Sequence, residues 1–160
     1  MEKTQPQQLT PPPVAPDDLM REERSNYMLV PKFMVGVKAN VQSNLHFIDD
    51  NTVCYPVGHN IVLYNTEDKS QKYISGVEGS LEITAMALTR NKKYLAVAER
   101  TERSPICIIY DLQTLKRKKI IATNEVLTAG SAFTSIAFSP KNDKLLVTLT
   151  DEPQQQLFVW

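Results

Sequence analysis

From Tyr27 onward, short apolar runs alternate with polar turns along the chain. The runs are rich in β-branched and aromatic side chains and are bounded by Asn, Asp, Gly or Pro, which is typical of β-strands. No segment keeps the spacing of apolar positions that a helix requires. We therefore expect an all-β body with strands at 33–37, 45–48, 53–57, 61–64, 72–74, 83–88, 94–98, 106–110, 116–121, 133–138, 144–148 and 157–160.

The pattern repeats along the chain. A shift of about fifty residues places 83–89 on 133–139 and 94–97 on 144–147 without a gap. A shift of about forty residues places 32–37 under 72–77, again without a gap. A unit of this length with four antiparallel strands is typical of a β-propeller blade.

Two features resemble the WD40 family of propellers. Phe138-Ser139-Pro140 followed by 143–147 is similar to its first strand, turn and second strand, and Tyr64-Asn65, Tyr110-Asp111 and Trp160 stand where its Trp-Asp pair ends the third strand. Gly58-His59 departs from the family, because it lies on the wrong side of the third strand. The resemblance implies a divergent, partial WD40-like propeller of about two and a half to three four-stranded blades.

The boundaries of this body come from proline and from blade counting. Five of the ten prolines lie in the first sixteen residues, beside several glutamines, so we expect residues 1–26 to be a disordered Pro/Gln-rich tail. The tail has two interpretations, a docking peptide or a solvated leader. Residues 27–160 then hold the first blades of a ring that is expected to continue beyond Trp160, because propellers close with four to eight blades. Residues 33–37 match a fourth strand and are expected to complete the last blade.

A closer resemblance is to cilia- and flagella-associated WD-repeat proteins, over about residues 30–160. It is carried by 57–65, 94–100, Ser104-Pro105, 108–112, 116–119 and 133–140. It implies a large scaffold of tandem propellers and a coiled coil in the ciliary or flagellar axoneme. The implied partners are inner dynein arms, doublet microtubule proteins and tubulin.

Composition narrows the partners further. Lys and Arg (18) balance Asp and Glu (18), which argues against binding nucleic acid through a basic face. No apolar stretch approaches the ~18 residues of a membrane span, so we expect no membrane contact. Cys54 and Cys107 lie far apart in strand-like runs, which suits buried thiols in a reducing compartment. We expect a cytoplasmic or cytoskeletal protein, and the closer resemblance implies the axoneme.

Catalytic and metal-binding patterns are weak. His46 and His59 are the only histidines, and no Cys-x-x-Cys or His-x-x-x-His spacing occurs, so we predict no metal site. The five glycines form no phosphate loop. His46 is interpreted as a satisfied structural histidine in a first strand. We therefore predict no enzyme activity, no catalytic residues and no cofactor.

One charged run is a candidate partner contact: Lys116, Arg117, Lys118 and Lys119. It either meets an acidic surface such as tubulin or keeps an outermost strand from pairing with other chains. Two functions stay open, an axonemal scaffold and a cytosolic peptide-binding adaptor or enzyme with a pocket in the central channel. The second needs polar groups where first strands begin, and there the chain offers Asn44, Glu82 and Ser131, which we expect to be unpaired.

Overall fold

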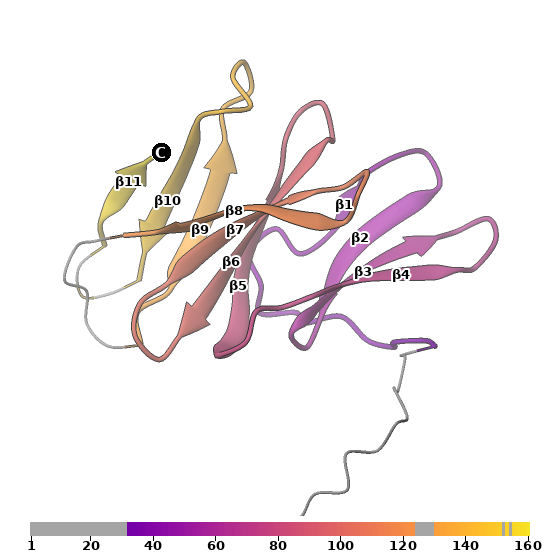
Figure 1. Ribbon diagram of the computed structural model, residues 1–160, viewed down its shortest axis with the longest axis horizontal. Helices are drawn as coiled ribbons and strands as arrows, with labels where there is room; N and C mark the ends of the chain where they lie inside the picture. Colours follow the sequence, from indigo (N-terminus) through magenta and orange to yellow (C-terminus); the bar gives the residue numbers. More distant parts are fainter. Residues whose placement is uncertain (1–31, 124–129, 152, 154) are drawn as a thin grey trace, which may run out of the picture. The chain divides into compact units, whose positions relative to one another are not determined.

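The computed structural model describes residues 32–123, 130–151, 153 and 155–160. In these ranges the chain folds into three antiparallel sheets and contains no helix, so none is long and apolar enough to cross a membrane (Figure 1). Strands that are consecutive in the chain are neighbours in each sheet. The first sheet holds β1 (His46–Phe47), β2 (Thr52–Val57), β3 (Asn60–Asn65) and β4 (Gln71–Ser75); the second holds β5 (Ser80–Leu88), β6 (Tyr94–Thr101), β7 (Ile106–Asp111) and β8 (Lys116–Ala122); the third holds β9 (Phe133–Phe138), β10 (Leu146–Thr150) and β11 (Leu157–Val159). The predicted all-β fold of nearly three blades is confirmed.

The second sheet is buried on both faces. Along β6, Leu95 and Val97 pack in a core with the first sheet, while Ala96 and Ala98 pack in a core with the third. A strand enclosed on both sides needs no polar alternation, and this explains its near-continuous apolar sequence. The face toward the third sheet carries small side chains, and Phe133, fully buried, is the largest side chain that fills the space above them.

The two outer sheets each leave one face without a sheet packed on it in the described part of the chain. Phe47 is 57% exposed on the first sheet, and Leu157 and Val159 are about as exposed on the third. This is the arrangement expected of consecutive blades from a larger ring.

The turns that end the third strands confirm the repeat. Asn65 ends β3 and its Oδ1 accepts hydrogen bonds from the backbone N–H groups of the next turn, and Asp111 does the same at the end of β7. Four residues later, Lys69 and Leu115 both take the left-handed backbone conformation, with φ of 60° and 57°. Asn65 and Asp111 therefore occupy equivalent positions in the two blades, as the sequence predicted for the Trp-Asp sites.

Two strand predictions are wrong. Residues 33–37 form no strand, because no described strand offers them a backbone ladder. The peptide group of Met34 instead exchanges two hydrogen bonds with the side-chain amide of Gln71, at 2.7 and 2.9 Å. The strand expected at 144–148 begins at Leu146, because Leu145 closes the preceding turn by bonding to Asn142 and Ser139. The tail predicted at 1–26 lies outside the described residues and stays a prediction.

Candidate partner-binding groove

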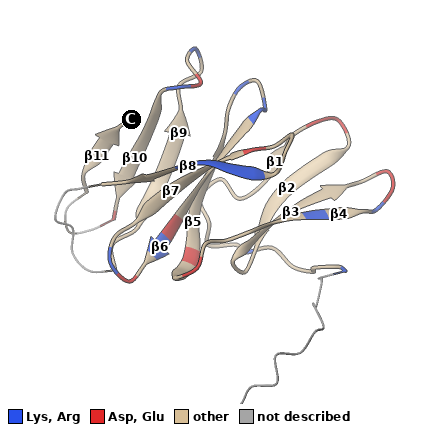
Figure 2. Cartoon of the chain, viewed as in Figure 1, with Lys and Arg blue, Asp and Glu red and all other residues tan. Residues whose placement is uncertain are grey.

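The basic run forms most of β8, the outermost strand of the second sheet (Figure 2). All four of its side chains are exposed. A register shift against β7 divides them between two sides. Arg117 stands opposite Tyr110 and Lys119 opposite Ile109, so Lys118 has no Cα partner in the ladder. Because such an irregularity redirects side chains, Lys118 and Lys119 lie on the side of the third sheet and Arg117 on the side of the first. The run predicted as one contact is therefore part of two surfaces.

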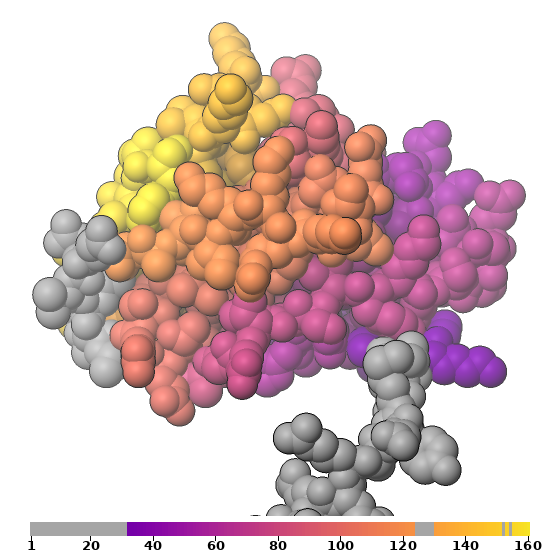
Figure 3. Space-filling view, in the orientation of Figure 1, coloured from indigo at the N-terminus to yellow at the C-terminus, as the bar shows by residue number. Residues whose placement is uncertain are grey.

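The larger surface is a groove between the second and third sheets, with a volume of about 650 Å³. In the space-filling view β8 (orange) lies beside the third sheet (gold to yellow) (Figure 3). Its floor is apolar and its rim carries four lysines and one aspartate. The lining residues are Asn91, Lys93, Tyr94, Ile109, Lys118, Lys119, Ile121, Phe138, Asp143, Lys144, Leu146 and Trp160. We call this surface the lysine groove.

Tyr94 organises one end of the lysine groove. The Lys118 ammonium donates a hydrogen bond to the Tyr94 hydroxyl at 2.6 Å and lies 4.2 Å from the ring centroid. The Lys93 ammonium lies 5.4 Å from the same centroid. The hydrogen bond from Lys118 lowers the pKa of the Tyr94 phenol. Nearby, Asn91 donates a hydrogen bond to Asp143 and so links the turns of two neighbouring blades.

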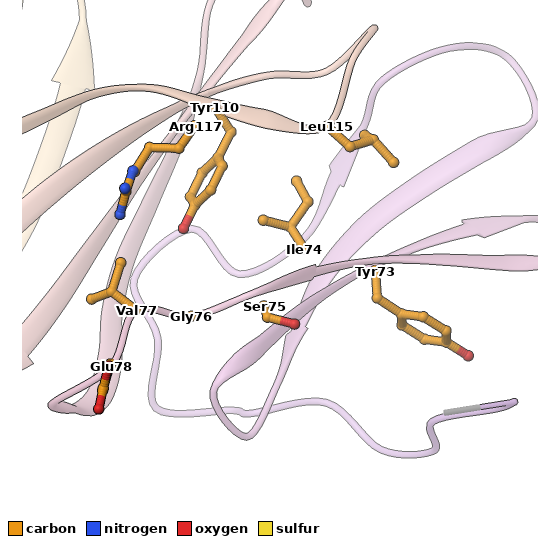
Figure 4. A pocket seen from close by; sticks show the side chains of 9 residues that line it. All are labelled: Tyr73, Ile74, Ser75, Gly76, Val77, Glu78, Tyr110, Leu115 and Arg117. Atoms are coloured by element: carbon orange, nitrogen blue, oxygen red, sulfur yellow. The ribbon is translucent and has the colours of Figure 1, made fainter. Parts of the chain in front are cut away.

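The second surface is a cleft of about 500 Å³ between the first and second sheets. Figure 4 shows its lining, with Arg117 and Tyr110 from the second sheet facing Ile74, Val77 and Glu78. The Arg117 side chain makes no hydrogen bond or ion pair within the described ranges. The lining of the cleft combines one cation and one carboxylate with hydroxyl and apolar side chains, a mixture that suits contact with a partner.

The polar groups expected at the starts of first strands are organised differently from the prediction. Glu82 is not unpaired: its carboxylate binds Lys38 at 2.9 Å and Arg100 at 3.3 Å, and the hydrogen bond from Lys38 lowers its pKa. Arg100 also approaches Asp151 of the third sheet at 3.8 Å. Sequence reasoning missed this chain of charges, because its members come from three sheets or their flanks and share no local motif.

The other two predicted channel residues, Asn44 and Ser131, carry no charge. The Asn44 side chain donates to the backbone oxygen of Lys38 at 3.2 Å, and Ser131 is buried. The structure therefore brings Asn44 near Lys38 but gathers no catalytic set from the three predicted positions. Across the described ranges, no three His, Cys, Asp or Glu side chains could together hold a metal ion.

His46 differs from the expected satisfied histidine. Its Nε2 is buried and has no hydrogen-bond partner among the described residues. Burial lowers the pKa of His46, which favours the neutral ring. A hydrogen bond with the backbone of Ser43 opposes this shift. Cys54 stands opposite His46 in the ladder, but burial raises the pKa of that thiol to about 12, so the pair gives no support for a general base acting on a nucleophile.

Cys54 and Cys107 are free thiols in the two inter-sheet cores, and both are fully buried. Burial raises the pKa of each to about 12. Since the thiolate is the reactive form, iodoacetamide at neutral pH is expected to leave both thiols unmodified in the folded chain and to alkylate both in urea. Mass spectrometry counts the added groups; alkylation of the folded chain at the rate seen in urea would contradict the burial.

Glu99 is a carboxyl group inside the protein, 1% exposed, on β6. The backbone N–H of Val77 donates to its Oε2 across a long 3.4 Å, and His59, Cys107 and Tyr110 lie close enough to interact with its charge. Burial raises the pKa of Glu99 above its ordinary value of 4.5. The folded chain therefore holds this proton more tightly than the unfolded chain does.

This raised pKa predicts a pH-dependent effect of Glu99→Gln. The parent loses stability as pH rises above 4.5 and through the folded-state pKa, because the unfolded chain releases the proton first. The variant lacks this loss, so it is expected to be the more stable protein at neutral pH and to match the parent below about pH 4. Urea unfolding across this range measures the difference. Glu102→Gln, at an exposed position, is the control; equal pH dependence of parent and Glu99→Gln would contradict the prediction.

The fold defines a class of protein, the WD40-type β-propeller. No protein-family model matches the chain. Among solved structures, the C-terminal WD40 domain of Sif2 matches with a TM-score of 0.57 and 14% identity, over 72% of this chain and 32% of that one. The propeller domain of Cps50 (Swd1) from Myceliophteria thermophila matches with a TM-score of 0.56 and 17% identity, over 79% and 38%.

Comparison with related sequences indicates which WD-repeat proteins this chain resembles. Cilia- and flagella-associated protein 57 of Mus musculus is 34% identical over 125 residues, or 78% of this chain and 10% of the relative. Protein 57 C of Tetrahymena thermophila is 37% identical over 58% of this chain and 7% of its own length, and mouse protein 44 is 29% identical over 84% and 7%. The chain thus spans a tenth or less of these curated relatives. It is a divergent WD40 propeller segment that resembles cilia- and flagella-associated protein 57.

Proposed function

We propose that this chain belongs to a non-enzymatic scaffold of the ciliary or flagellar axoneme whose propeller docks other proteins. The observation that carries the proposal is that relatives named cilia- and flagella-associated proteins 57, 44 and 43 align with 78%, 84% and 73% of the chain. The two surfaces beside β8 support it, because both offer contact chemistry and neither has the convergent groups of a catalytic site. In this role the protein helps position inner dynein arms on doublet microtubules.

Fractionation of ciliated cells tests the location. An antibody against residues 1–26 is applied to detergent-soluble and axonemal fractions, with tubulin as the marker of the axoneme. The proposal expects the native protein in the axonemal fraction. A protein found only in the soluble fraction would exclude the axonemal role and favour a cytosolic peptide-binding adaptor.

Depletion tests the finer role. Axonemes from depleted cells are compared with controls by quantitative mass spectrometry. Inner-arm dynein heavy chains are expected to fall while outer-arm dyneins and tubulin stay constant. If the amount of inner-arm dynein is unchanged, the protein does not position inner arms, and only the axonemal scaffold role stands.

A further inference from the structure

We propose that the lysine groove binds an extended, carboxylate-rich segment of a partner protein and holds an aromatic or aliphatic side chain of that segment over its floor. The inference rests on the proposed function only in taking the partner to be a protein. It concerns only the side of β8 that faces the third sheet, whereas the sequence predicted a partner contact for the basic run as a whole.

The charge of the lysine groove fits a carboxylate-rich partner. The whole chain has no net charge, yet this groove gathers four lysines against one aspartate. Asp143 already accepts a hydrogen bond from Asn91. The ammonium groups of Lys119 and Lys144 make no hydrogen bond or ion pair in the described part of the chain, so a carboxylate binds them without breaking an existing pair. Complementary charge of this kind speeds association and selects partners.

The floor fits an apolar side chain. Phe138 and Trp160 pack at the margin of the core between the second and third sheets, and Trp160 is fixed in place. Its indole N–H donates to Thr148 at 3.0 Å, and its ring stacks on Phe158 with centroids 5.7 Å apart. A ring that is already ordered loses little conformational entropy on binding, which favours affinity.

The backbone of β8 favours an extended partner. This strand pairs with β7 on one side, and no strand pairs with its other edge in the described residues. A peptide strand can add to such an edge through main-chain hydrogen bonds while its alternate side chains enter neighbouring pockets. The lysine groove runs beside this edge, so one extended segment can use both.

A nucleic acid fits less well. Single-stranded nucleic acids bind by stacking bases on exposed aromatic faces. The Lys118 ammonium lies 4.2 Å from the centroid of Tyr94 and occupies a ring face that a base would need. The balanced charge of the chain also offers few phosphate contacts outside the groove.

The probe is a labelled peptide of sequence Glu-Ser-Phe-Ser-Glu-Ser-Phe, as long as the seven residues of β8, with fluorescence anisotropy as the readout. Because alternate side chains of an extended strand share a face, its glutamates and phenylalanines all lie on the face that meets the lysine groove. The full 160-residue chain is expected to bind it, and salt is expected to weaken binding. Lys119→Glu with Lys144→Glu is expected to weaken binding at least about tenfold. The matched control, Lys72→Glu with Arg117→Glu, makes the same charge change on the side of the first sheet and is expected to leave binding within about twofold of the parent.

Several results would overturn the inference: equal binding by the parent and the groove variant, equal losses in both variants, or tighter binding of a uridine oligonucleotide than of the peptide. Replacing the phenylalanines of the peptide with serine must also weaken binding. Thermal unfolding verifies that each variant folds, and Lys119→Gln with Lys144→Gln replaces a variant that does not. If the protein is axonemal but does not bind the peptide, only this inference fails. If the protein binds the peptide but occurs only in the soluble fraction, only the proposed location fails.

Discussion

Replacing Phe133 with alanine is expected to lower the free energy of unfolding by about 3–5 kcal/mol, the usual cost of removing a large buried ring. Phe133 is fully buried at the start of β9 and packs edge-on against Phe158, with centroids 6.3 Å apart. Opposite it the second sheet presents mainly alanines, whose side chains cannot extend to fill the space. The cavity therefore stays open, and the second and third sheets lose much of their shared core.

Urea unfolding of the full chain measures this loss, provided that the slope of the transition is unchanged. Phe47→Ala is the matched control, because Phe47 is 57% exposed on β1 and its truncation is expected to cost under about 1 kcal/mol. Similar losses in the two variants would show that Phe133 does not fill a rigid core. If urea unfolding shows two separate transitions and Phe133→Ala shifts only one of them, the third sheet unfolds independently of the others.

The strands could be predicted because burial leaves a direct trace in the sequence. β6 and β7 are enclosed on both faces, so apolar residues run almost without interruption, and polar turns separate the runs. Residues 33–37 show the limit of this reasoning. Their pattern matches that of β4, but a strand exists only where another backbone completes its ladder, and apolar periodicity does not report whether that partner is present.

Only part of the candidate site could be predicted from the sequence. The four basic residues of β8 stand together in the chain, but the register shift that sends Lys118 and Lys119 to one side and Arg117 to the other depends on pairing with β7. The floor of the lysine groove combines residues from two blades, such as Tyr94 and Trp160, that are distant in sequence. The ion pairs of Glu82 with Lys38 and Arg100 likewise join residues that are distant in sequence. A signal was present in part, because the shift of fifty residues aligns Tyr94 with Lys144, two residues that line the same groove.

Gly76→Ala is expected to destabilise the protein by about 1–3 kcal/mol, the range for forcing extra atoms into packed structure. Gly76 follows β4, where the chain crosses from the first sheet to the second, and its N–H donates to the backbone oxygen of His59 at 2.9 Å. A Cβ at this position would lie 2.6 Å from that same oxygen. Because the obstacle is a backbone atom in a hydrogen-bonded hairpin, it cannot rotate away as a side chain would. The crossover must shift instead, which weakens the contact between the two blades.

Ser75→Ala is the control for this substitution, since it yields an alanine at the neighbouring exposed position and is expected to change the free energy of unfolding by no more than about 0.5 kcal/mol. Hydrogen exchange adds a local readout: the amides of residues 75–80 should lose protection in Gly76→Ala before those of β6 do. Equal stability of the two variants would mean that the crossover yields without cost and that the blades are joined only by their side-chain core. A loss confined to the crossover amides would instead locate the strain at the junction, where the backbone of one blade is held against the hairpin of the one before it.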